Sequence, residues 1–346
     1  MSAKTLTSWV ACAVLSALSG CSVGYLAQSV GGHWDLVSRA RPVDDWMADP
    51  ATPQRLRDRL ALAQRLRRFA IEELRLPDHA SFQRFAQIHR PAVIWNVVAA
   101  PELSLEPKTW CFPVVGCVAY RGYFDREQAA AYAQTLKNEG LEVYIAAVPA
   151  YSTLGKTDWL GGDPLLDTFL YWDEAALARL IFHEMAHPLV FVPGDTAFNE
   201  SFASAVEQLG LTRWWRSTRG SAAPPKDARL AQQQQALKDL RQTLREIYSR
   251  AVSDGQRREA KAAALAKFRS LHPEIATELL NNASLALRSS YDDGVSAFEQ
   301  LFQDEGQDFE KFYAAAQRWA QLTEDQRRLK LQPRVGATPL SGDPRL

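Results

Sequence analysis

The chain has 346 residues, with 40 basic and 40 acidic side chains and a formal net charge of zero. This balance excludes the basic bias that indicates nucleic-acid binding, and there is no like-charged tail. A mature part of about 325 residues can bury a sizeable core, as one large domain or two closely joined lobes. Neither composition nor charge indicates an oligomeric state.

Residues 1–20 have the features of an export signal peptide. Lys4 supplies the positive start, and the apolar run over 9–18 is too short to remain as a membrane span. Residues 18–21 read LSGC, which resembles the lipobox of bacterial lipoproteins. That resemblance implies a lipid on Cys21 and, with Ser22 behind it, sorting to the outer membrane facing the periplasm. The alternative is an ordinary secretory signal that is cleaved nearby.

The first half of the mature chain mixes helices and strands. Apolar residues recur at helical spacing over 53–75, and β-like runs follow at 92–100, 117–124 and 141–150. Asp125 is placed to cap a helix that ends at Gly140, between the last two of these runs. The segment 151–165 is rich in turn-forming residues.

Two cysteines remain once Cys12 leaves with the signal and Cys21 carries the lipid. Cys111 and Cys117 most simply form a disulfide, because an exported chain meets an oxidising compartment. Closing so small a loop stabilises a fold by about 2 to 3 kcal/mol. Buried free thiols are the alternative, and a metal site is disfavoured because no histidine lies nearby.

The second half is predicted to be helical almost throughout. One helix runs up to His187 with Asp173 near its start, the turn VPGD follows, and a second helix is expected over 196–210 with Gly210 as its stop. Further helical patterns lie at about 256–270, 274–291, 295–303 and 308–322, after an apolar stripe over 237–247. The sequence therefore predicts an α+β lobe over 21–215, a helical lobe over 216–325 and a flexible tail over 326–346.

Residues 183–187 read HEMAH, in which the two histidines lie one helical turn apart on the same face. His183 and His187 can therefore both bind one ion with bonds of about 2 Å. Glu184 is placed to take a proton from a water on that ion, which makes it the predicted catalytic base. The competing interpretation is a pair of ordinary histidines on an amphipathic helix.

Zinc hydrolases use three protein ligands and leave one coordination position open. Glu200 follows on the next helix and is the predicted third ligand, so that one Zn²⁺ per chain is expected. Ser204 and Glu207 share its helix face, from which either can orient a ligand histidine. Exposed carboxylates on an amphipathic helix would explain each glutamate singly, but not the order of HExxH and NExxA.

This ligand order resembles the gluzincins, which are zinc peptidases with two histidines and one glutamate. The stretches WCFPVVGCVAYRGYF, AYSTLG, LIFHEMAH, DTAFNESFASAVE and NNASLAL further resemble one bacterial family, the predicted lipoprotein aminopeptidases. The resemblance covers most of the mature chain. It implies a zincin-like core, with a small mixed sheet and the HExxH helix, followed by a mostly α-helical C-terminal half. It also implies a zinc-dependent aminopeptidase that hydrolyses peptide bonds in the cell envelope.

A donor beside the metal is needed for the oxyanion that develops on the substrate. Related zinc peptidases often use Tyr or His, and Tyr291 is the preferred candidate here, with Tyr151 as the second; a buried core tyrosine is the competing interpretation for either. Pro188 departs from the expected pattern because proline disfavours helical geometry at His187 and lacks a backbone donor. The helix must therefore end or kink at that ligand.

Two other functions stay open. The sequence has no GxMEN motif for binding a free α-amine, so an endopeptidase or a cell-wall amide hydrolase with the same zinc chemistry is the first alternative. The second is a non-catalytic envelope lipoprotein that binds a partner through its helical half. The joint presence of His183, Glu184, His187 and Glu200 argues against such a loss of catalysis.

Overall fold

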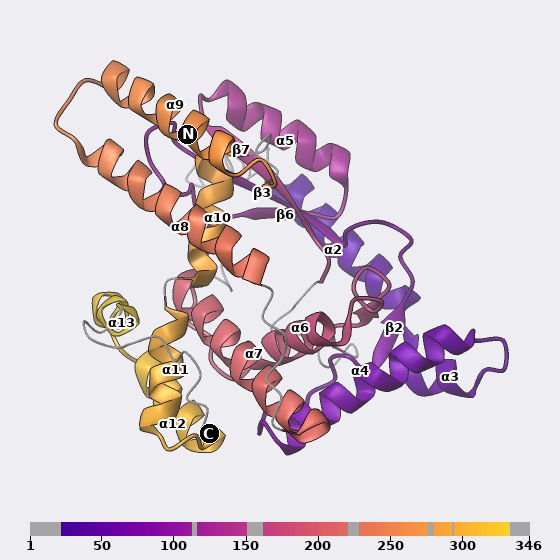
Figure 1. Cartoon of the computed structure of the whole chain (residues 1–346). Helices are drawn as coiled ribbons and strands as arrows, with labels where there is room; N and C mark the ends of the chain where they lie inside the picture. The colour runs from indigo at the N-terminus through magenta and orange to yellow at the C-terminus, as the bar shows by residue number, and fades with distance from the viewer. Residues whose placement is uncertain are drawn as a thin grey trace, which may run out of the picture.

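The computed structural model describes residues 22–112, 116–150, 162–220, 228–275, 280–292 and 294–332. Within these ranges the architecture is α+β, with short β-sheets beside a majority of helices (Figure 1). In the described part of the chain no helix is both long and apolar enough to cross a bilayer. The predicted signal peptide, Cys21 and Tyr151 lie outside the described residues.

The main sheet is antiparallel and has β3 (Ile94–Ala100) between β6 (Arg121–Tyr123) and β7 (Glu142–Val148). Helix α5 (Arg126–Asn138) connects β6 to β7 and packs its alanine-rich face on the sheet. Its first turn is capped by Asp125, which accepts a hydrogen bond from a backbone amide at 2.8 Å. The strands predicted over 92–100 and 141–150, the Asp125 cap and the helix between them are therefore confirmed.

The single strand expected over 117–124 is wrong. β5 (Gly116–Val118) pairs with β4 (Trp110–Phe112) in a separate hairpin, and only β6 joins the main sheet. Because each segment pairs with a different neighbour, the chain leaves the extended ladder between β5 and β6. Cys111 lies opposite Cys117 in the hairpin, and their sulfur atoms form the disulfide.

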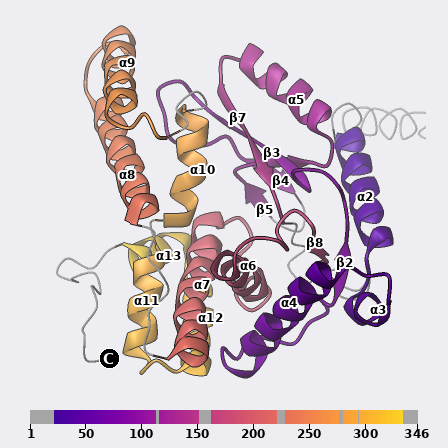
Figure 2. The same ribbon diagram turned by 45° about the vertical axis from the view of Figure 1, so that its right-hand side comes forward.

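A smaller sheet lies among the N-terminal helices (Figure 2). Its strands are β1 (Arg41–Pro42), β2 (Arg84–Ala86) and β8 (Leu165–Leu166), with β2 antiparallel to β1 and parallel to β8. The helices are α2 (Ser22–Arg39), α3 (Val43–Ala48) and α4 (Gln54–Glu72). Helix α4 matches the helix predicted over 53–75, and its apolar stripe is buried in the main core.

Helices α6 (Glu174–Ala186) and α7 (Thr196–Arg219) pack together in the largest hydrophobic cluster. Helix α7 does not stop at Gly210, as was predicted from the local sequence. A Cβ at Gly210 would lie 2.7 Å from Leu74 Cδ1 and 2.8 Å from Phe182 Cδ2. The glycine therefore permits a close contact inside the helix and does not end it.

The C-terminal helices divide between two cores. Helices α11 (Val295–Asp304) and α12 (Phe309–Ala320) pack with α7 in the largest cluster, whereas α8 (Ala228–Ser249) and α9 (Asp254–Leu271) share a cluster of their own. The expected tail over 326–346 is wrong at its start, because α13 (Glu324–Leu331) extends into it. Thr323 and Gln326 form a capping box at the start of α13, and Arg327 is buried.

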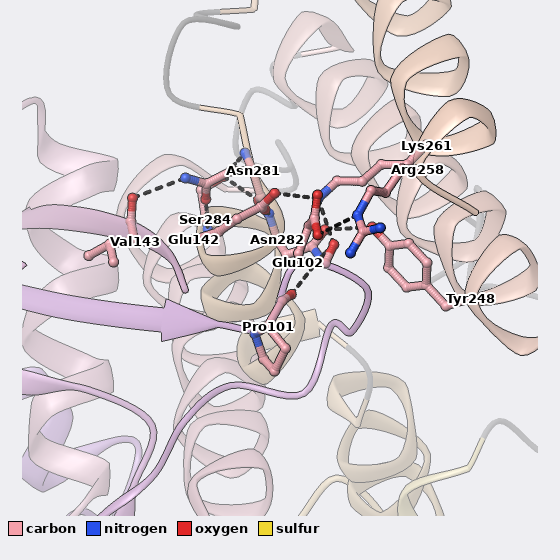
Figure 3. Close-up of polar contacts among 10 residues, drawn as sticks. All are labelled: Pro101, Glu102, Glu142, Val143, Tyr248, Arg258, Lys261, Asn281, Asn282 and Ser284. Atoms are coloured by element: carbon pink, nitrogen blue, oxygen red, sulfur yellow. Dashed lines mark hydrogen bonds and ion pairs between the residues drawn. The ribbon is translucent and has the colours of Figure 1, made fainter. Parts of the chain in front are cut away.

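Helix α10 (Asn282–Asp292) begins later than the helix predicted over 274–291, and a polar network holds its start (Figure 3). The Asn282 amide group donates to the carbonyls of Pro101 and Glu102 at 2.9 and 2.8 Å. Its backbone nitrogen donates to Glu142, which also pairs with the buried Lys261 of α9. The network therefore ties α9 and α10 to the main sheet.

Candidate metal centre

Helix α6 carries the HEMAH sequence at its C-terminal end. Asp173 caps the start of the helix by accepting from a backbone amide at 2.9 Å. The helix ends at Ala186, yet His187 keeps helical dihedral angles of φ −55° and ψ −42°. The helix thus ends directly before Pro188 without turning the predicted ligand His187 away, and the His183 and His187 ring centroids lie 4.9 Å apart.

The turn after α6 brings α7 back alongside it. Asn199 holds this turn through hydrogen bonds with both the nitrogen and the oxygen of Val192, each at 2.8 Å. Asp195 caps α7 by accepting from an amide of its first turn at 3.1 Å. Arg327 of α13 donates to the other Asp195 oxygen at 2.7 Å. These contacts fix the start of the helix that carries Glu200.

The three predicted metal ligands come together from α6 and α7. Glu200 Oε2 lies 3.2 Å from His183 Nε2, and Glu200 Oε1 lies 3.9 Å from His187 Nε2. One donor atom from each residue lies within 4.8 Å of the other two. Two imidazole nitrogens and a carboxylate oxygen are a donor set that catalytic zinc uses, with bonds of about 2 Å. The residues present therefore fit a zinc ion after a small contraction of the site.

Glu207 contacts His183 on the side away from Glu200. Its Oε2 lies 3.3 Å from His183 Nδ1, and its Oε1 accepts from Arg179 at 3.1 Å. With the ring proton on Nδ1, the Nε2 lone pair faces Glu200, as a metal ligand requires. Ser204, the other residue predicted to orient a histidine, is buried on the same helix, but the His183 ring contacts Glu207 instead.

The two imidazoles differ in protonation when no metal is bound. Burial lowers the pKa of His183, but its hydrogen bonds with Glu200 and Glu207 outweigh this and raise the pKa well above its usual value. Burial lowers the pKa of His187 to about 4, against the opposite effect of Glu200. His183 therefore favours its charged form, and His187 favours its neutral form.

Glu184, the predicted base, follows His183 directly on α6, and its charge is among those that raise the pKa of His183. Tyr120 is a further residue whose pKa is affected by the glutamates of this site. Burial raises the pKa of its phenol, and the nearby charges of Glu200 and Glu184 raise it further. The Tyr120 phenol therefore favours its protonated form.

Tyr120 lies beside the main sheet. It lies between β5 and β6 and packs against Val98 and Ala100 of β3 and Ala283 of α10. In the sequence it stands inside a run that reads as one uninterrupted strand, so no local signal distinguishes it. Tyr291 lies in α10, but its side chain is outside the described residues, so the sequence prediction for it stays a prediction.

The disulfide hairpin rests on the turn between the two site helices. Gly116, with φ +76°, lies so close to this turn that a Cβ would come 2.6 Å from the Gly194 nitrogen. Only glycine fits both the backbone conformation and the space. The hairpin of Cys111 and Cys117 therefore covers the turn that connects His187 to Glu200.

Comparison with known proteins points to the peptidases, a class of hydrolases. A family model described as "Putative aminopeptidase" matches residues 24–331, and the chain belongs to this family. The match confirms the aminopeptidase family that the sequence resembles. No curated protein and no solved structure matches the chain.

Proposed function

We propose that this protein is a zinc-dependent aminopeptidase with a zincin-like core, held in the cell envelope by a lipid on Cys21. The observation that carries the zinc chemistry is the convergence of His183, His187 and Glu200, with 3.2 and 3.9 Å between the glutamate oxygens and the two ring nitrogens. The family description supports the peptidase class. The LSGC sequence supports the lipid anchor and the outer-membrane location.

A zinc ion held by His183, His187 and Glu200 would lower the pKa of a water molecule and polarise the substrate carbonyl. Glu184 would accept a proton from the attacking water and deliver it to the leaving amine. The Tyr120 hydroxyl would donate a hydrogen bond to the carbonyl oxygen as negative charge develops there. We propose Tyr120 for this donor because the charges of both Glu200 and Glu184 raise the pKa of its phenol. Tyr291, whose side chain is outside the described residues, stays the candidate that the sequence predicts.

Two substitutions test the base and the ligand set. Glu184→Gln should keep the fold and the zinc but lower kcat by about 10²- to 10⁴-fold, as expected for loss of a general base. Glu200→Ala should release most of the metal, as measured by elemental analysis. Glu72→Gln, at an exposed glutamate on α4, is the matched control for both. Unchanged zinc in Glu200→Ala would place the third ligand elsewhere.

Substrates with free and with blocked termini distinguish an aminopeptidase from the alternative functions. Fluorogenic amino-acid amides with a free α-amine should be hydrolysed, and acetylation of that amine should abolish the hydrolysis. Cleavage of internally quenched peptides with blocked termini would instead indicate an endopeptidase. Purified protein with neither zinc nor hydrolysis of any peptide would indicate the non-catalytic lipoprotein.

A further inference from the structure

The outer face of helix α2 is apolar and exposed to solvent. Val30 and Trp34 lie one helical turn apart and are 68% and 65% exposed. Ala27 and Gly31 are exposed on the same face. Between Ser22 and Trp34, the sequence of α2 contains no Asp, Glu, Lys or Arg and one histidine, His33. Tyr25 lies on the inner face. We call Ala27, Val30, Gly31 and Trp34 the outer face of α2.

The opposite side of α2 packs against the main sheet and forms hydrogen bonds with it. Gln28 donates to the Gly122 carbonyl at 3.2 Å and accepts from the Phe124 amide at 3.1 Å. Tyr25 packs edge-on against Tyr123, with 5.5 Å between ring centroids. Gly32 lies so close to Phe124 that a Cβ would come within 2.1 Å of its ring. Because these contacts oppose rotation of α2 about its own axis, they fix the direction of its outer face relative to the rest of the fold.

We infer that the outer face of α2 lies on the surface of a lipid bilayer and thereby orients the whole protein. The inference rests on the proposed lipid at Cys21, which directly precedes α2. At a rise of about 1.5 Å per residue, Val30 and Trp34 lie only about 12 and 18 Å along the helix from Ser22, the residue that follows Cys21. No linker separates the lipid from the helix, so the bilayer is within reach of this face.

The composition of the outer face suits this partner. Tryptophan collects at the boundary between lipid headgroups and acyl chains, where its ring is buried and its N–H stays hydrated. A helix that lies in this boundary buries an uncharged apolar side by roughly 5 to 10 Å. A second copy of the chain could also cover such a face, but the lipid at Cys21 places a bilayer beside it first.

The test uses the full chain, processed and acylated, in vesicles of phosphatidylethanolamine and phosphatidylglycerol. An environment-sensitive fluorophore is attached to Val30→Cys, or to Leu329→Cys as the control. Leu329 is 66% exposed on α13, far from α2 (Figure 2). Cys111 and Cys117 are paired and stay unlabelled. We expect emission from position 30 to shift to shorter wavelength and to be quenched by spin-labelled lipid, while position 329 responds only to aqueous iodide.

Two results would overturn the inference. Position 30 could respond like position 329, or its shift could grow with protein density and ignore spin-labelled lipid, which would indicate a second copy. Trp34→Glu should weaken lipid quenching at position 30 and leave hydrolysis of a soluble peptide unchanged.

Failure of the anchor or of the activity is measured separately. Mass spectrometry reports the lipid on Cys21, and peptide hydrolysis reports the metallopeptidase. A chain without acyl groups that still shows lipid quenching at position 30, when mixed with vesicles, would support the outer face and reject only the anchor. A chain that shows neither acylation nor quenching would reject both.

Discussion

His183 Nδ1 and Glu207 Oε2 lie 3.3 Å apart, and the same carboxylate contacts Arg179 through its other oxygen. This pair joins α6 to α7 on the side of the imidazole away from Glu200. A carboxylate in this position fixes the tautomer and direction of a ligand histidine and increases its basicity.

Loss of this contact should weaken the metal centre. Glu207→Ala should lower zinc affinity by about 10- to 100-fold, the usual effect of removing such a partner. Ser204→Ala, on the same helix but without contact to the ring in the described contacts, should leave the affinity unchanged. Competition with a chelator measures both, and equal affinities would contradict the assignment.

Zinc binding near pH 7 should release about one proton, because metal replaces the proton on a ligand histidine. The proton comes from His183, whose pKa is raised well above its usual value, whereas His187, with a pKa of about 4, is already neutral. The release should fall as pH rises through the raised pKa of His183. Calorimetry in buffers of different ionisation enthalpy counts the protons; a release independent of pH would contradict the prediction.

Tyr120→Phe should lower kcat by about 10²- to 10³-fold, the effect of losing one oxyanion donor, with little change in KM or in zinc content. Tyr144 packs in the same apolar cluster and provides the control Tyr144→Phe. Steady-state kinetics on an amino-acid amide makes the comparison. The role of Tyr120 would be rejected by equal kcat values for the two variants.

Gly210→Ala should lower the free energy of unfolding by a net amount of up to about 2 kcal/mol, because an overpacking cost of about 1 to 3 kcal/mol opposes a gain of about 1 kcal/mol in helix propensity. The new methyl group would meet Leu74 and Phe182, the residue before the first ligand. Gly31→Ala is the matched control, because a Cβ at Gly31 has no neighbour within 4 Å. This control should be stabilising by about 0.5 to 1 kcal/mol. Urea denaturation distinguishes the two, and a stabilised Gly210→Ala would show that the contact is absent.

Replacing Cys111 and Cys117 together by serine should lower the free energy of unfolding by about 2 to 3 kcal/mol, because the disulfide no longer restricts the unfolded chain. The urea midpoint of the double variant should match that of the wild-type chain in reductant. Equal midpoints for the variant and the oxidised wild-type chain would show that the disulfide adds no stability.

The proximity of His183, His187 and Glu200 could be predicted because it depends on local spacing. His183 and His187 lie one turn apart on one helix, and a short turn with capping residues returns the next helix with Glu200. Tyr120 could not be predicted in this way, since its position depends on which strands pair. The strands of two residues, β1 and β8, carry no periodic pattern and exist only through their neighbours.

Local signals were also overridden by packing. Gly210 has the character of a helix end, but its contact with Phe182 keeps it inside α7. Thr323 and Gln326 provide a local sequence signal for the start of α13. The packing of α13 depends instead on a distant contact, because Arg327 pairs with Asp195, 132 residues earlier. Such distant pairs leave no trace in a single sequence.

The clamp between Arg327 and Asp195 has a consequence for the order of assembly. Asp195 caps the first turn of α7, the helix that carries Glu200. Because Arg327 of α13 donates to the other Asp195 oxygen, this cap is complete only after α13 has packed. During synthesis, both histidines leave the ribosome long before Arg327 does. With the export proposed above, lasting capture of a metal ion is therefore expected only after the whole chain has crossed the inner membrane.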